Sequence, residues 1–169
     1  FSFMKWVKQS IHYWCPDTKE HKFLGQNVTV AILDTGISPH PDFKDRILSF
    51  RDFSSTTGSS EKVLFSFSHF SPLIDNSGHG THVAGILAGS GLLSSGTYAG
   101  IAPFCNLIIG KVLDQNGNGS IKNVINGIQW IRDIYTQFHI RIINISVGTR
   151  PDLSIHQKLL LLNAVESLW

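Results

Sequence analysis

Three short runs of apolar, mostly β-branched residues constrain the fold of this chain more than any other feature. They cover residues 28–33 (VTVAIL), 108–112 (IIGKV) and 141–146 (RIINIS), and each is bounded by polar or glycine-containing turn residues. Runs with so few polar positions are typical of strands that are buried on both faces. They therefore predict a parallel sheet that is covered by other elements on both sides.

Helical patterns alternate with these runs. Apolar residues at positions 121, 124, 125, 128, 131 and 134 recur every three or four residues behind the N-cap candidate Ser120, and they predict an amphipathic helix over 121–136. A second predicted helix spans 155–169 behind Ser154, and a third, rich in small residues, spans 80–88 (GTHVAGILA). This order predicts an α/β domain with a mainly parallel β-sheet and helices on both faces.

The composition narrows the class of protein. The chain has 169 residues, 42% of them hydrophobic, which suffices for one domain with a single core. Its net charge is +2 without a long basic run, so we expect no nucleic-acid partner. No apolar stretch approaches the roughly 18 residues of a membrane span. Cys15 and Cys105 are too few for a disulfide scaffold.

One segment is expected to leave the body of the domain. A surface excursion is predicted for residues 54–60 (SSTTGSS) and the irregular residues 61–75 that follow them.

Two residues stand out as candidates for proton chemistry. Asp34 directly follows the first apolar run, at the sheet edge where reacting groups of α/β proteins gather, although a strand-end Asp alone is usually a turn former. His79 lies in residues 75–85 (DNSGHGTHVAG), where the positive end of the following helix is expected to favour the neutral imidazole of a general base. His82, one turn later, is expected to point into packing.

At these positions the chain resembles a known family. Residues 30–43 (VAILDTGISPHPDF) and 78–89 (GHGTHVAGILAG) resemble the subtilisin-like serine proteases, the subtilases of peptidase family S8, and 143–148 (INISVG) resembles their substrate-binding strand. That family places its catalytic triad in the chain order Asp, His, Ser. The resemblance implies that Asp34 orients the imidazole of His79, which takes the proton from a serine hydroxyl.

The resemblance also implies two segments that line an extended peptide substrate by strand addition. They consist of Lys111 and Val112 with Gly117, Asn118 and Gly119, and of Ser146, Val147 and Gly148.

Two further family features have no counterpart in this sequence. The family's nucleophile lies in a Gly-Thr-Ser-Met-Ala-like segment, whereas the most similar segment here, 96–99 (GTYA), has tyrosine in place of serine. The oxyanion-hole asparagine is also missing, since Asn144 lies on an earlier strand. We therefore expect residues 1–169 to be the N-terminal portion of a single subtilase catalytic domain, truncated, and inactive without the remainder. The alternative is a non-catalytic or degenerate subtilase fragment that at most binds peptides.

Metal sites are poorly supported by the sequence. Asp42 matches a calcium ligand of some family members, but the segment 89–100 (GSGLLSSGTYAG) offers few ligands for a hard cation. His79, His82 and Asp75 could suggest zinc, yet a spacing of three between the histidines is a poor match. We expect no cofactor and leave calcium open.

A second enzyme class shares one motif with this chain. Asp-Thr-Gly after a hydrophobic strand is also a signature of aspartic proteases, and 107–110 (LIIG) resembles their second strand. The predicted helices argue against that nearly all-β fold. A parallel sheet that is cut after its third or fourth strand leaves an edge unpaired, so we expect low solubility and weakly cooperative unfolding of the isolated chain. Subtilases occur both secreted and inside cells, and the sequence leaves the compartment open.

Overall fold

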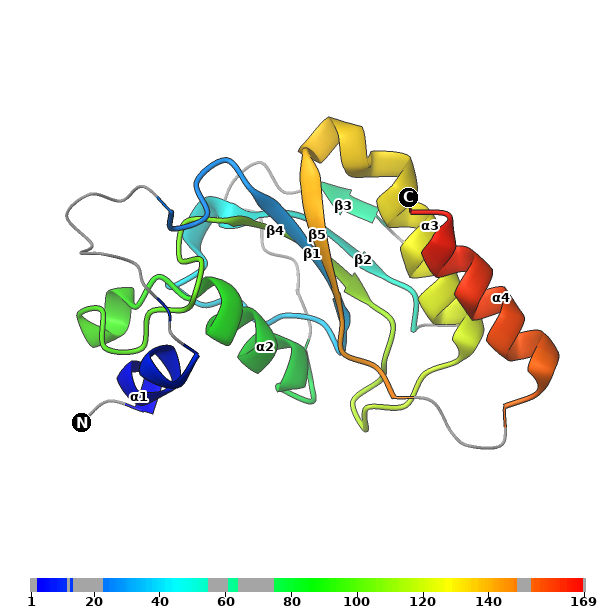
Figure 1. Cartoon of the computed structure of the whole chain (residues 1–169), viewed down its shortest axis with the longest axis horizontal. Helices are drawn as coiled ribbons and strands as arrows, with labels where there is room; N and C mark the ends of the chain where they lie inside the picture. The colour runs from blue at the N-terminus through cyan, green and yellow to red at the C-terminus, as the bar shows by residue number, and fades with distance from the viewer. Residues whose placement is uncertain are drawn as a thin grey trace.

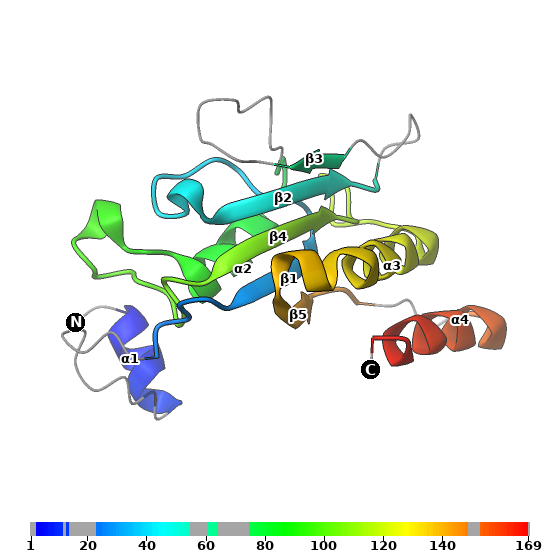
Figure 2. The same ribbon diagram turned by 90° about the horizontal axis from the view of Figure 1, so that it is seen from above.

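The structure, a computed structural model, describes residues 3–11, 13, 23–54, 61–63, 75–148 and 153–168. Five strands form one sheet in the order β3-β2-β4-β1-β5, which Figure 2 shows from above. The strands are β1 (Thr29–Asp34), β2 (Ile47–Asp52), β3 (Glu61–Val63), β4 (Asn106–Lys111) and β5 (Ile140–Ile145). The helices are α1 (Phe3–Ser10), α2 (His79–Ala88), α3 (Ile121–Phe138) and α4 (Ile155–Glu166), with 3₁₀ turns at Lys44–Arg46 and Leu92–Ser94.

The sheet is mainly parallel, as the sequence predicts. Strand β1 pairs in parallel with both β4 and β5, and β2 pairs in parallel with β4. Only β3 runs antiparallel to its neighbour β2 among the strands of the described ranges. All six residues of β1 are buried, because this strand lies between β4 and β5 and is covered on both faces.

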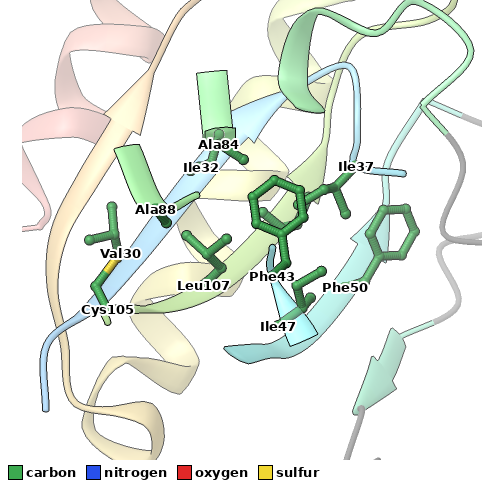
Figure 3. Packing of buried hydrophobic residues seen from close by; sticks show 11 residues of the cluster. Val30, Ile32, Ile37, Phe43, Ile47, Phe50, Ala84, Ala88, Cys105 and Leu107 are labelled. Carbon is green, nitrogen blue, oxygen red and sulfur yellow. The ribbon is translucent and has the colours of Figure 1, made fainter. Parts of the chain in front are cut away.

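Helices cover both faces of the sheet, which confirms the predicted three-layer arrangement (Figure 1). On one face, Val30 and Ile32 pack with Ala84 and Ala88 of α2, as Figure 3 shows. On the other face, Ala31 and Leu33 pack against α3 and Ala164 of α4. Each large aliphatic side chain that is fully buried here contributes roughly 1.5–3 kcal/mol to the stability of the fold. Strand β1 contributes such side chains to the cores on both faces of the sheet.

Two predicted helices begin at the expected caps. The hydroxyl of Ser120 accepts the backbone N–H of Asn123 at 3.1 Å, and α3 continues to Phe138 rather than 136. Ser154 forms a reciprocal capping box with Gln157 at the start of α4. Helix α4 ends at Glu166, three residues before the expected end at 169, and packs mainly against α3. None of the helices in the described part of the chain is both long and apolar enough to span a bilayer.

Three elements were not expected from the sequence. Strand β2 and helix α1 lie in segments for which we predict no element, and β3 falls inside the predicted surface excursion 61–75. The expectation of an irregular segment is therefore wrong for β3, because its short polar run EKV pairs with Ser49, Phe50 and Arg51 of β2. Cys15 and the remainder of the excursion before Asp75 lie outside the described residues.

Candidate active site

Asp34 occupies the carboxyl end of β1, an interior strand of the sheet. It is the last residue of β1, and its side chain is fully buried. Its Oδ1 accepts the backbone N–H of Thr35 at 2.7 Å. Its backbone carbonyl accepts the N–H of Val112, the residue directly after β4, at 2.9 Å. These two hydrogen bonds hold Asp34 in place independently of its contact with His79.

His79, the first residue of α2, meets this carboxylate. Its Nδ1 lies 2.7 Å from Asp34 Oδ1, although the two residues are 45 positions apart. The imidazole remains 53% exposed while the carboxylate is inaccessible. Because Nδ1 is engaged by Asp34, the Nε2 edge of the ring is the edge left to exchange protons with another group.

The close approach of α2 to β1 depends on a glycine. A Cβ atom at Gly80 would collide with the carbonyl oxygen of Gly36 and lie 3.2 Å from the Asp34 Cβ. Gly80, Ala84 and Ala88 form the buried face of α2. Small residues at this spacing let the helix backbone approach the strand closely enough for His79 to reach Asp34.

The neighbouring charges raise the pKa of His79. The hydrogen bond that the ring donates to Asp34 and the charge of Asp34 are the main causes, the charge of Asp75 adds to them, and burial opposes them. The expectation that the helix terminus would favour the neutral ring is therefore wrong. A carboxylate at 2.7 Å acts more strongly on the ring than the partial positive charge at a helix end.

His82 does not point into packing, contrary to the sequence expectation. It lies two residues after Gly80, on the side of α2 opposite the buried face, and is exposed. It lines a groove of about 700 Å³ together with Phe43, Ile86 and Tyr98. Among the described residues, no group of three His, Cys, Asp or Glu side chains is arranged to hold a metal ion, so the zinc reading gains no geometric support.

Asp75 is a site residue whose role was missed from the sequence. Its carboxylate accepts hydrogen bonds from the hydroxyls of Thr35 and Thr81 and from the amides of Gly78 and Thr81. Burial acts to raise the pKa of Asp75, but these hydrogen bonds outweigh it and lower the pKa below its ordinary value. The sequence does carry a signal for this role. Asp75 lies three residues before Gly78, which precedes α2, and an aspartate at such a position often accepts hydrogen bonds from the N–H groups of the following turn.

The first predicted substrate-lining segment divides into two parts. Lys111 and Val112 are buried, and the Lys111 ammonium donates to the carbonyls of Thr35 and Leu113. Both side chains are committed to the interior, so the prediction that this segment lines a peptide by strand addition concerns its main chain. The residues at 117–119 are exposed in a turn that the Asp114 carboxylate holds by accepting N–H bonds.

The second predicted segment follows β5. Ser146 and Gly148 are exposed and Val147 is half-buried. This segment and the turn at 117–119 follow the carboxyl ends of β5 and β4, the same edge of the sheet as Asp34 (Figure 1).

Asp42, which matches a calcium ligand by resemblance, has other partners here. Its carboxylate accepts the N–H groups of Gly91 at 3.0 Å and Leu93 at 3.2 Å. Its carbonyl accepts the guanidinium of Arg46. A calcium ion needs a cage of oxygen ligands, and the groups around Asp42 are donors, so these residues do not fit calcium.

The fold and the paired carboxylate and imidazole define an α/β domain with part of a proton-transfer site. A model of the subtilase family, peptidase S8, matches residues 25–166. The chain belongs to the subtilase family.

Individual relatives agree with this assignment. The chain is 46% identical over 106 residues to serine protease AprX of Bacillus subtilis strain 168, covering 63% of this chain and 21% of AprX. It is 37% identical over 134 residues to subtilisin E of the same organism, covering 79% of this chain and 30% of subtilisin E. This chain thus spans less than a third of either relative.

Solved structures share the fold. The CspB protease of Clostridium perfringens superposes with a TM-score of 0.72 at 27% identity, over 87% of this chain and 34% of that one. Sphericase superposes with a TM-score of 0.69 at 27% identity, over 85% of this chain and 43% of that one.

Proposed function

We propose that this chain is the N-terminal portion of a subtilisin-like serine endopeptidase domain and supplies the Asp and His of its triad. One observation carries this proposal, the 2.7 Å contact between His79 Nδ1 and the buried Asp34 carboxylate, with the opposite ring edge exposed. The substrate class is an extended peptide or protein.

The contact between the two side chains and the exposed ring edge support the following roles for them. His79 Nε2 takes the proton of a serine hydroxyl as the oxygen attacks the peptide carbonyl, and then delivers that proton to the leaving amine nitrogen. Asp34 holds the ring in orientation and stabilises the imidazolium that forms between the two transfers. The serine and the oxyanion-hole asparagine come from polypeptide outside these 169 residues, so the chain alone has no peptidase activity.

A chimeric protease tests this assignment. Residues 25–166 of this chain replace the matching segment of subtilisin E, and a fluorophosphonate probe, which reacts only with an activated serine, reports function. We expect labelling of the chimera, and a fall of at least about 10⁴-fold in peptidase rate for Asp34→Asn or His79→Ala. His156→Gln, on the exposed side of α4, is the matched histidine control and retains the rate.

Two outcomes contradict the proposal. A folded chimera that resists the probe would indicate that Asp34 and His79 do not activate a serine, as expected of a degenerate fragment that at most binds peptides. Labelling of the 169-residue chain by itself would show that it contains an activated serine of its own.

A further inference from the structure

We propose that Asp75 is a positioning residue for the Asp34–His79 pair, acting through Thr35 and the first turn of α2. The inference deepens the proposed function and rests on it, since the separation of the pair matters for catalysis only if the pair moves protons. Asp75 itself touches neither the imidazole nor a substrate.

The Asp75 carboxylate is buried and uses both oxygens. Oδ1 accepts the hydroxyl of Thr35 and the amide of Gly78, each at 2.8 Å. Oδ2 accepts the amide of Thr81 at 2.8 Å and its hydroxyl at 2.6 Å. Hydrogen bonds to an ionised carboxylate are among the strong ones in proteins. One side chain thus joins the end of β1 to both flanks of His79 along the chain.

Thr35 closes the connection between the two halves of the site. Its hydroxyl donates to Asp75 and accepts the amide of Gly80 at 2.9 Å. Thr35 directly follows Asp34 in the sequence, and Gly80 directly follows His79. The relay from Asp75 through Thr35 to Gly80 therefore fixes the backbone beside each member of the pair relative to the other.

The backbone before His79 needs such support. Gly78 has a φ of +84°, and α2 has no side-chain cap at this position. Asp75 instead accepts the amides at the helix start that would otherwise lack partners. Without the Asp75 bonds, the first turn of α2 keeps only the Thr35–Gly80, Asp34–His79 and Ser38–Thr81 hydrogen bonds to other described segments. Displacements of about 1 Å at a catalytic group can cost roughly 100-fold in rate.

Charges around the imidazole are limited to a few groups in the described part of the chain. Asp34 faces it from β1, and Asp75 acts on it from the loop before α2. Lys111 of β4 donates to the carbonyl of Thr35 and so supports the same relay from the opposite side. The carboxylate of Asp75 thus contributes both hydrogen bonds and a negative charge to the site.

The test measures the imidazole of His79 in the whole chain by nuclear magnetic resonance, without substrate. We expect Asp75→Asn to lower the pKa of His79 and to raise amide exchange at Gly80 by about tenfold or more, because it replaces an acceptor with a donor. Asp133→Asn, an exposed carboxylate on α3 at the other face of the sheet, is the matched control and leaves both unchanged.

The Thr35 hydroxyl provides a second, milder variant. Thr35→Val removes the relay while the other bonds to Asp75 remain, and Thr35→Ser restores the hydroxyl. We expect Thr35→Val to weaken the Asp34–His79 hydrogen bond and Thr35→Ser to recover it, a pattern that general loss of packing does not produce. If Asp75→Asn fails to fold, the comparison of Thr35→Val with Thr35→Ser still tests the positioning role of Asp75.

The proposal is overturned if folded Asp75→Asn keeps the pKa of His79 and the Gly80 exchange rate of the parent chain. It is equally overturned if Thr35→Val and Thr35→Ser behave alike. Neither readout depends on peptidase activity, so failure here is distinct from failure of the chimera to react with the probe.

Discussion

The two central residues differ sharply in their access to solvent. Asp34 is inaccessible, and its Oδ2 receives no hydrogen bond from any described residue, while half of the His79 imidazole faces outward. The charge of the buried carboxylate is therefore balanced chiefly by the imidazole, which can still meet an external proton donor. This division suits a pair in which one partner transfers the proton and the other stabilises the resulting charge.

The raised pKa of His79 makes stability depend on pH in a defined direction. The imidazole of His79 keeps its proton to higher pH in the native chain than in the unfolded chain, where the pKa of a histidine is about 6.5. The stabilisation is full below that value and is lost as the pH rises through the native pKa of His79. Urea unfolding at a series of pH values should show this loss in the parent chain.

The same measurement on Asp34→Asn should lack that pH dependence, because the main cause of the raised pKa is gone. His156→Gln, which removes an exposed histidine, should retain it. A parent chain whose stability rises over this range would contradict the assigned direction.

The elements of this fold were predictable where their signals are local. Continuous apolar runs predict β1, β4 and β5, and serine caps predict the starts of α3 and α4. The short strand β3 depends on pairing with a neighbour and carries no such signal. The orientation of His82 followed from which small residues of α2 face the sheet, a tertiary choice that the helix pattern alone does not reveal.

The candidate site was predictable only in part for the same reason. Motifs identify Asp34 and His79, but the burial of Lys111 depends on the carbonyls of Thr35 and Leu113, which come close only in the folded sheet. The role of Asp75 likewise depends on Thr35, which lies 40 residues away. Contacts at such separations require the fold to be known.

Two glycines of α2 provide a matched pair of substitutions. Gly80→Ala places a Cβ against the Gly36 carbonyl, so α2 must shift away from β1 and the Asp34–His79 hydrogen bond should lengthen or break. Gly85→Ala adds a methyl group in open space and should stabilise the helix by up to about 1 kcal/mol. Thermal unfolding and the His79 imidazole resonances distinguish the two, and equal behaviour would contradict the close-approach argument.

At the scale of the whole molecule, apolar side chains of β5 and α4 are exposed to solvent, and β5 lies at one edge of the sheet. Strand β5 pairs with β1, and within the described ranges nothing pairs with its other edge. Ile142 of β5 is 53% exposed, and Ile155, Leu159 and Leu162 of α4 are exposed as well. An open strand edge beside apolar side chains is a typical site of association between chains.

Self-association should therefore respond to charge at this edge. We expect Ile142→Lys to raise the highest protein concentration at which the chain is still monomeric, as measured by analytical ultracentrifugation. Gln129→Lys, at an exposed position of α3, adds the same charge elsewhere and should have a smaller effect. An equal gain from both variants would attribute solubility to net charge and not to the edge.

The hydrogen bond between Asp34 and His79 can be observed directly through the Nδ1 proton of His79 in the 169-residue chain. We expect a strongly deshielded, slowly exchanging Nδ1 proton that is lost in Asp34→Asn while the sheet stays intact. A His79 ring that exchanges rapidly in the parent chain, and whose resonances do not respond to Asp34→Asn, would contradict this expectation.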